Sequence, residues 1–369
     1  WVPLKSGLPT IAVRDIAIQE RENDLVLGTF GRGFYVLDNY SPLRELEYVL
    51  DQEAAFFTTK PGLLFRRANI GGTDYKGAQL YKAKNPEVGT TFEWYLAENA
   101  KRVKENRPEA NNELPHYPSL DQLQAEDWEE KPYLLFEISD SLGNPVARFT
   151  KSDSKGISRH TWDGRMSSKA SIRTNGEPVT EAYGTTFVLP GTYFLSLSRA
   201  TNGALETLVE RHEFKVNHLY NYEGIDMEFN QSVDALMAVS NQINARYTEL
   251  KEDLNRLRAG LRNTPGASLE DLNTARSIDI ELRELGLLLK GDATRTKREF
   301  EAGASLGDVT GLLAWGTFNH RGAPTGSMRA MKEDAEAMIA DATAALEKID
   351  EKLDQLEANA REQGVPYWD

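Results

Sequence analysis

Serine, acidic and histidine side chains follow one another in an order that serine hydrolases use. Residues 303–307 read Gly-Ala-Ser-Leu-Gly, so Ser305 matches the nucleophile-elbow pattern, and Asp308 and His320 come after it. In such enzymes a buried strand precedes the serine and a helix follows it. Here the preceding residues 298–301, Arg-Glu-Phe-Glu, are typical of a helical region and not of a buried strand. We therefore interpret 303–307 as a small-residue loop between helices.

The five histidines do not form a recognisable metal-binding pattern; they are His116, His160, His212, His218 and His320. His212-Glu213 begins like a zinc-protease helix, but that motif needs a second histidine four residues after the first, where Val216 stands. A two-histidine site of His212 and His218 stays an alternative to two positions near the end of a surface strand. We predict no metal ion and no cofactor.

A glycine-rich segment at 28–33, Gly-Thr-Phe-Gly-Arg-Gly, is the next candidate. A phosphate cradle would need a helix directly after it, whereas residues 34–37 have the pattern of a strand. The glycines are therefore expected to form a tight turn with positive φ. Arg32 projects from this turn and is our candidate for a ligand-facing residue; the alternative is an arginine that is salt-bridged or merely exposed.

Carboxylates are too numerous to identify a glycosidase by themselves. Glycoside hydrolysis needs two carboxylates about 5 to 10 Å apart across a sugar site, and this chain has 57 acidic residues. Asp163 beside Trp162 resembles a sugar-stacking arrangement, yet a core tryptophan next to a turn aspartate is the commoner case. We predict no catalytic residue within this chain.

The composition excludes several classes of protein. A net charge of −14 disfavours nucleic acid and anionic lipid, which are bound through clustered Lys and Arg. With no cysteine, the chain lacks disulfides, thiolate zinc sites and cysteine nucleophiles. No apolar run approaches the roughly 20 residues of a membrane-spanning helix. Trp1 is followed by neither a charged nor an apolar targeting segment, so we expect a processed or truncated product.

The first part of the chain has the pattern of strands. Residues 1–45 alternate as strand, polar turn, strand, glycine turn and strand. Three short strands cannot bury both faces of a sheet by themselves, so we expect 1–45 to complete a larger β structure. Residues 46–88, with a Gly71-Gly72 turn, are expected to be a connector that packs along neighbouring surfaces.

Residues 89–218 predict a second β region. Seven short strand patterns occur there, at 91–97, 133–139, 146–150, 157–162, 185–189, 192–198 and 208–216. Turn signals at 142–145 and 190–191 separate some of them, and the spacing favours an immunoglobulin-like β-sandwich. Residues 98–131 are too polar for its core and are expected to form a long surface excursion.

Residues 222–369 change to a helical period. Apolar residues recur every three or four positions in three stretches, at 229–261, 269–289 and 331–360. This pattern predicts an antiparallel three-helix bundle, and with it a multidomain β plus α protein. The region has 17 Lys and Arg against 27 Asp and Glu. We interpret this charge as solvated helix faces; an acidic docking surface is the alternative.

Two segments carry a resemblance to a known family. Residues 13–18, Val-Arg-Asp-Ile-Ala-Ile, and 24–38, Asp-Leu-Val-Leu-Gly-Thr-Phe-Gly-Arg-Gly-Phe-Tyr-Val-Leu-Asp, resemble the closing blade of bacterial sortilin-like β-propeller proteins, which are often labelled glycosyl hydrolases. Residues 162–165, Trp-Asp-Gly-Arg, with 189–193, Leu-Pro-Gly-Thr-Tyr, are similar to the immunoglobulin-like domain after such propellers and to that of flagellar hook-capping proteins. The excursion at 98–131 and the absence of the aspartate-box repeat depart from the family.

The resemblance implies a function. It favours a non-catalytic binding and scaffold segment of a secreted or periplasmic bacterial protein, whose upstream blades would bind a protein or glycan ligand. The first alternative is a glycoside hydrolase with its catalytic carboxylates upstream of Trp1. A third possibility is a surface-assembly component that docks a partner helix on its helices, which exposed aromatic or Met residues there would favour.

Overall fold

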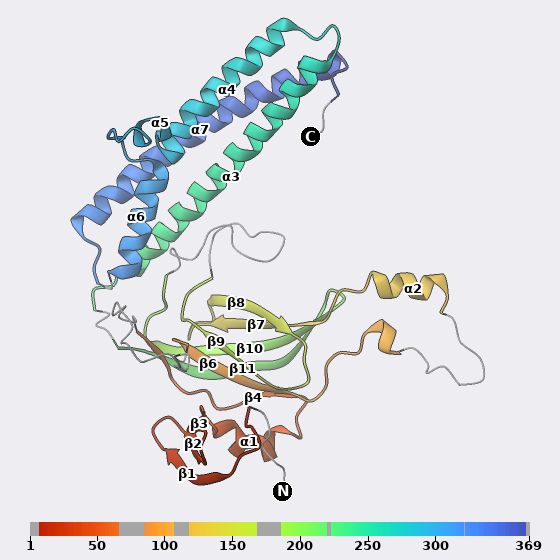
Figure 1. Ribbon diagram of the computed structural model, residues 1–369, viewed down its shortest axis with the longest axis vertical. Coiled ribbons are helices and arrows are strands. Elements are labelled where there is room, and N and C mark those ends of the chain that lie inside the picture. The colour runs from red at the N-terminus through yellow and green to blue at the C-terminus, as the bar shows by residue number, and fades with distance from the viewer. Residues whose placement is uncertain are drawn as a thin grey trace. The chain divides into compact units, whose positions relative to one another are not determined.

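The computed structural model describes residues 7–65, 85, 87–106, 118–167, 186–219, 223–320 and 322–366. These residues contain seven α-helices and three sheets, so the expected combination of β and α structure is confirmed at that level (Figure 1). The chain divides into two compact units, which are Trp1–Arg165 with Leu189–Leu219, and Met166–Val188 with Tyr220–Asp369. The turn expected at Gly71-Gly72 and the residue His116 lie outside the described residues.

The first sheet is an antiparallel meander of three strands. It consists of β1 (Val13–Gln19), β2 (Asp24–Thr29) and β3 (Phe34–Leu37), in that order. The three strands and both turns expected here are confirmed. Gly31 and Gly33 have φ of 76° and 72° in the second turn, as glycines at such positions allow.

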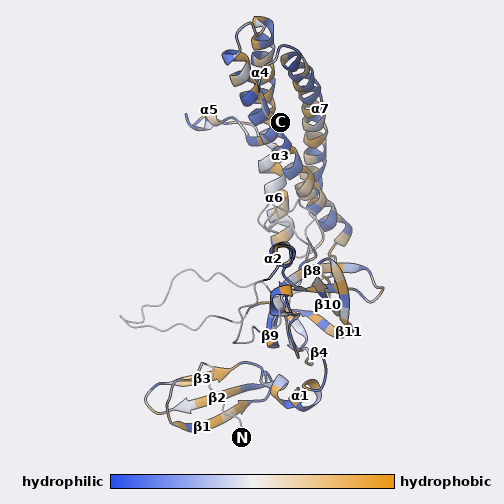
Figure 2. Ribbon diagram, turned by 90° about the vertical axis from the view of Figure 1, so that its right-hand side faces the viewer, coloured by the Kyte–Doolittle hydropathy of each residue, from blue (hydrophilic) through white to orange (hydrophobic). Residues whose placement is uncertain are grey.

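Neither face of this sheet is buried. The register pairs Ile16 with Leu27 and Leu27 with Tyr35, so these side chains share one face. Ala17, Val26 and Val36 pair across the three strands on the other face. Ile16 is 61% exposed and Val36 is 53% exposed. Figure 2 shows hydrophobic residues along all three strands. The sheet therefore presents apolar side chains on both sides.

A short helix and a short strand follow. Helix α1 (Ser41–Val49) leads to β4 (Ala54–Phe56), and Val49, Ala55 and Phe57 form a small core with Leu46 and Tyr95. Neither element was expected within the connector at 46–88. Among the described residues of this connector, β4 pairs with β6 in an antiparallel register.

Two further sheets contact each other through aromatic side chains. One has the order β5-β11-β10-β7-β8 and the other β4-β6-β9. Their bounds are β5 (Gly62–Leu64), β6 (Thr90–Leu96), β7 (Tyr133–Ser139), β8 (Pro145–Ser152), β9 (Gly156–Trp162), β10 (Gly191–Thr201) and β11 (Ala204–His218). Ring centroids of Phe92 and Phe214 lie 4.8 Å apart across the two sheets, as do those of Trp94 and Phe136. These aromatic rings form the core between the sheets.

One strand expected in this region does not form. The described residues 186–189 of the predicted strand 185–189 are not a strand. The main-chain N–H and the hydroxyl of Thr186 donate to the carboxylate of Asp234, at 2.6 and 2.7 Å. The main-chain oxygen of Thr186 accepts from the N–H of Met166 at 2.9 Å, so this segment contacts the chain after β9 without forming a strand. In the excursion at 98–131, the described residues form a single 3₁₀ turn (Val103–Asn106) and α2 (Leu120–Asp127), which buries no residue.

The second unit is built on two long helices, α3 (Met227–Asn263) and α7 (Gly326–Glu362). Helix α4 (Leu269–Lys290) packs on the part of them that contains Leu254 and Leu353. After the single turn α5 (Ala293–Thr296), α6 (Leu306–Asn319) packs on the part that contains Phe229 and Met328. The three helical stretches expected here are confirmed, but α6 was not expected.

Candidate functional site

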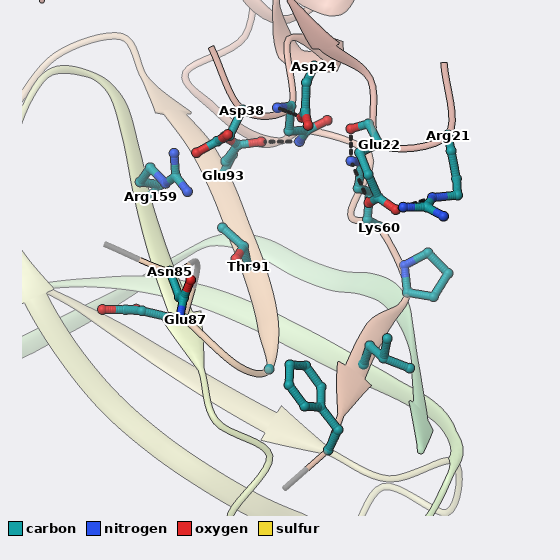
Figure 3. A pocket seen from close by; sticks show the side chains of 15 residues that line it. Arg21, Glu22, Asp24, Asp38, Lys60, Asn85, Glu87, Thr91, Glu93 and Arg159 are labelled. Carbon is teal, nitrogen blue, oxygen red and sulfur yellow. Dashed lines mark hydrogen bonds and ion pairs between the residues drawn. The ribbon is translucent and has the colours of Figure 1, made fainter. Parts of the chain in front are cut away.

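A cavity of about 770 Å³ lies in the first unit (Figure 3). Its walls come from five places: the β1–β2 turn, the residues after β3, the segment around β5, the residues just before β6, and the neighbouring strands β6 and β9. The polar residues of the lining are Arg21, Glu22, Asp24, Asp38, Asn39, Lys60, Asn85, Glu87, Thr91, Glu93 and Arg159. A small-molecule site typically has a volume of about 300 to 1,000 Å³, so the cavity is large enough for a ligand.

Asn39 is fixed at the edge of the cavity by hydrogen bonds. Its main-chain N–H donates to Oδ1 of Asp24 at 3.0 Å, and its Nδ2 donates to Oε2 of Glu93 at 2.8 Å. The residue adopts φ of 51°, a left-handed conformation that asparagine tolerates better than most residues. Its Oδ1 is buried and has no partner among the described residues. A buried acceptor without a donor is costly, and because this oxygen has almost no accessible surface, a ligand in the cavity cannot offset that cost unless Asn39 moves.

Glu93 and Arg159 form the strand wall of the cavity. They are direct partners in the β6–β9 register, so their side chains lie on the same face. Burial of Glu93 raises its pKa, although the charge of Arg159 and the hydrogen bond from Asn39 oppose the shift. Glu93 therefore keeps its proton to a higher pH than an ordinary glutamate does.

The charges on the opposite wall are already paired. Nε of Arg21 lies 3.0 Å from Oε1 of Glu22, and Nζ of Lys60 lies 3.6 Å from Oε2. Lys60 also donates to the main-chain oxygen of Glu22. Below them, Leu63 and Phe65 are each 38% exposed and supply apolar surface. The cavity thus combines donors, acceptors and apolar groups, which is the composition of a binding site.

Arg32, the ligand-facing candidate from the sequence, is not part of this cavity. It lies exposed in the β2–β3 turn, whereas Arg21 and Glu22 in the β1–β2 turn line the cavity. These turns are at opposite ends of β2, so the structure does not bring Arg32 together with the cavity residues.

Ser305 has a structural role at the start of α6. Its Oγ accepts from the main-chain N–H of Asp308 at 3.2 Å, and the side chain of Asp308 accepts from the N–H of Ser305 at 2.9 Å. This is a capping box. The hydrogen bonds from Ser305 also lower the pKa of Asp308. His320 follows the other end of the helix, about 20 Å away for 14 residues, so no triad forms.

Replacing Ser305 with alanine should therefore affect stability and no ligand or substrate step. We expect Ser305→Ala to reduce the stability of the second unit by about 1 kcal/mol, the usual effect of a lost N-cap. Thermal unfolding followed at helical wavelengths measures this change. Ser305→Thr, which keeps the hydroxyl, is the matched control. Loss of a hydrolytic activity without loss of stability would contradict the capping role.

The two histidines of β11 are too far apart to share a metal ion. His212 and His218 are six residues apart on one strand, which is about 20 Å. Nε2 of His212 lies 2.8 Å from the hydroxyl of Thr59, its ring contacts Phe56, and burial lowers its pKa. No group of three or more potential metal ligands occurs within the described ranges of the chain.

Trp162 belongs to the core and not to a sugar site. It is 6% exposed, and its Nε1 donates to the main-chain oxygen of Arg165 at 2.9 Å. Asp163 pairs with Arg165 at 3.1 Å in the turn that follows. The interpretation of a core tryptophan with a turn aspartate is confirmed.

Sequence reasoning missed the cavity residues. Asn39, Glu93 and Arg159 are separated by more than 50 residues from one another and fall in no motif. One local signal was present: Glu93 is a charged residue between the apolar Phe92 and Trp94 of a strand pattern. Such a position lies on the face of the sheet that points away from its core.

No protein-family model matches this sequence. No curated protein matches it either. In the part of the chain that the structure describes, no helix has both the length and the apolar character of a membrane span.

Proposed function

We propose that this chain is the C-terminal segment of a secreted, bacterial, sortilin-like β-propeller protein, and that it binds and scaffolds without catalysing a reaction. In this proposal, strands β1 to β3 are the last blade strands, 89–218 is an immunoglobulin-like sandwich and 222–369 is a helical bundle. The aromatic contacts between two of the sheets and the shared apolar core of α3, α4 and α7 support the two finer assignments.

One observation carries the proposal, namely the apolar character of both faces of the first sheet. Ile16 and Leu27 lie on one face and Val36 on the other, and all three strands lack a buried residue. A sheet that faces water on one side has polar residues on that side. Apolar residues on both sides instead favour a sheet that is stacked between neighbours, as a propeller blade is.

Cysteine labelling tests this proposal cleanly because the chain has no cysteine of its own. Ile16→Cys and Val36→Cys probe the two faces, and Leu142→Cys is the control in the β7–β8 turn, where Leu142 is 85% exposed. We expect all three to react with maleimide at similar rates in this segment. In the complete natural chain, residues 16 and 36 should react at least about tenfold more slowly, because neighbouring blades would cover them.

Unchanged labelling of residues 16 and 36 in the complete chain would refute the propeller assignment. Protection of one residue alone would refute a sheet stacked on both sides. Residue 142 should stay equally reactive in both forms of the protein, which controls for a general change in access.

A second candidate function, docking of a partner helix, is favoured by the exposed face of α6. Leu312 and Trp315 are both more than half exposed there, while Leu313 and Ala314 are buried against α3 and α7. Aromatic and large apolar residues left exposed on a helix are common at protein interfaces. Maleimide labelling of Leu312→Cys separates the two candidates. If residue 312 is protected in the complete natural chain with no other protein present, another part of the same chain covers this face of α6.

A further inference from the structure

The cavity beside β6 and β9 offers both hydrogen-bond acceptors and hydrogen-bond donors at short range. Glu93 presents a carboxyl group, which is held in place by a hydrogen bond from Nδ2 of Asn39 to its Oε2 at 2.8 Å and has further lone pairs that can accept from a ligand. Arg159, the cross-strand partner of Glu93, contributes a guanidinium group, which only donates. In Figure 3, Glu93, Asp38 and Arg159 lie along one wall of the cavity. A ligand bound there must donate and accept within one small region.

The arrangement of charge disfavours a strongly charged ligand. The lining also contains Asp24, Asp38 and Glu87, so an anion beside Arg159 would be repelled by several carboxylates. A cation beside Glu93 would be repelled by Arg159. On the far wall, Glu22 is already paired with Arg21 and Lys60, so it offers no free charge to either kind of ligand. Hydroxyl groups fit this lining better, because each hydroxyl both donates and accepts and carries no charge.

The floor of the cavity is apolar. Pro61, Leu63 and Phe65 line it, and the last two keep over a third of their surface exposed. Such a surface can cover the C–H face of a ligand whose hydroxyls point toward the polar wall. The volume of about 770 Å³ accommodates a ligand of several rings.

From these features we propose that the cavity is a binding site for a neutral, hydroxyl-rich ligand, and specifically for an uncharged oligosaccharide. Glu93 accepts hydrogen bonds from its hydroxyls, and Arg159 donates to them. The site consists of residues of this chain alone and does not depend on any propeller blade outside it, so the inference goes beyond the proposed function.

A panel of uncharged oligosaccharides tests the proposal, followed by titration calorimetry on the glycans that bind. We expect Glu93→Gln and Arg159→Met each to weaken binding of the best glycan at least about tenfold, as loss of a charged hydrogen-bond partner does. Arg148→Met is the matched control. Arg148 is also the cross-strand partner of a glutamate, Glu137, but on the other sheet and outside the cavity.

Several outcomes would overturn the proposal. They are the absence of binding by every glycan of the panel, equal affinity of the Arg159→Met and Arg148→Met proteins, and binding of Lys- and Arg-rich peptides in preference to glycans. Circular dichroism of each variant shows whether the fold is retained, and Glu93→Gln keeps the shape of the side chain. The cysteine-labelling result is independent, so failure of this proposal leaves the proposed function to be judged separately.

Discussion

Replacement of Trp162 with alanine should lower the free energy of unfolding of the first unit by about 3 to 5 kcal/mol, the range for a large aromatic residue lost from a core. The ring lies between the sheets, with its centroid 6.0 Å from that of Phe214 and 6.3 Å from that of Tyr193. Both contacts are edge-to-face, which adds to the effect of burial. Its N–H also donates to the main-chain oxygen of Arg165, so the substitution removes one hydrogen bond to the turn after β9.

The turn itself leaves little room for adjustment around Trp162. Gly164 has φ of 81°, and a Cβ placed there would lie 2.5 Å from Leu64. The turn must therefore keep its close approach to β5 when the indole is removed. The space that the indole leaves cannot be filled by movement of this turn. For this reason we expect the effect to fall in the upper part of that range.

The measurement must distinguish the two compact units of the chain. A single denaturation curve can mix two transitions when a protein has more than one unit. Hydrogen exchange at amides of β7 and β10 reports the first unit directly. Trp128→Ala is the matched control, because Trp128 is 76% exposed and its loss should change stability by less than about 0.5 kcal/mol. Equal effects of the two substitutions would contradict a core role for Trp162.

The strands that the sequence predicted correctly are those with a clear period of two. In β6, Phe92 and Trp94 alternate with Glu93 and Tyr95, and burial alternates in step. The strands that it missed are β4 and β5, of three residues each, which are too short to show a period. Strand β5 also pairs in parallel with β11, about 150 residues later in the chain, and no local pattern indicates such a partner.

Helix α6 shows how one signal can support two interpretations. Its sequence contains Gly307, Gly311 and Gly316, and glycine lowers helix propensity. From the sequence, 303–307 was interpreted as a small-residue loop between helices, and no helix was predicted at 306–319. The pair Ser305 and Asp308 was the available signal, because serine at the N-cap with an acidic residue three positions later is a capping pattern. Gly303 and Gly307, on either side of Ser305, also match the nucleophile-elbow pattern.

The cavity depends on the register of strands and turns and was therefore beyond sequence reasoning. Glu93 meets Arg159 because β6 and β9 pair in one register; a shift of one residue would turn one of the two side chains to the other face. Asn39 meets Glu93 because the chain leaves β3 with a left-handed residue. Neither condition leaves a trace in local composition.

The buried arginine of β10 is expected to be as important as Trp162. Arg199 is 9% exposed at its side chain and connects three segments. Its Nη2 donates to the main-chain oxygen of Glu98 at 2.6 Å, its Nη1 lies 3.1 Å from Glu53, and its Nε lies 3.5 Å from Asp153. Asp153 is almost fully buried and accepts from the N–H of Ala100 at 2.7 Å. The cluster therefore holds the start of the polar excursion at 98–131 against the sheets.

Arg199→Met should reduce the stability of the first unit by about 3 to 5 kcal/mol, because it leaves the carboxylate of Asp153 buried without a cation. Methionine keeps most of the apolar stem, so the change isolates the charge. Arg148→Met is again the control: its pair with Glu137 is exposed, and such pairs contribute about 0 to 1 kcal/mol.

The double variant Arg199→Met with Asp153→Leu decides between two explanations of that loss. If the unpaired carboxylate causes it, removal of the carboxylate should restore part of the stability, since a buried ion pair can be replaced by apolar groups at little cost. If the lost hydrogen bond to Glu98 causes it, the double variant should be less stable than Arg199→Met. Hydrogen exchange at Ala100, whose N–H donates to Asp153, follows the same comparison at the junction itself.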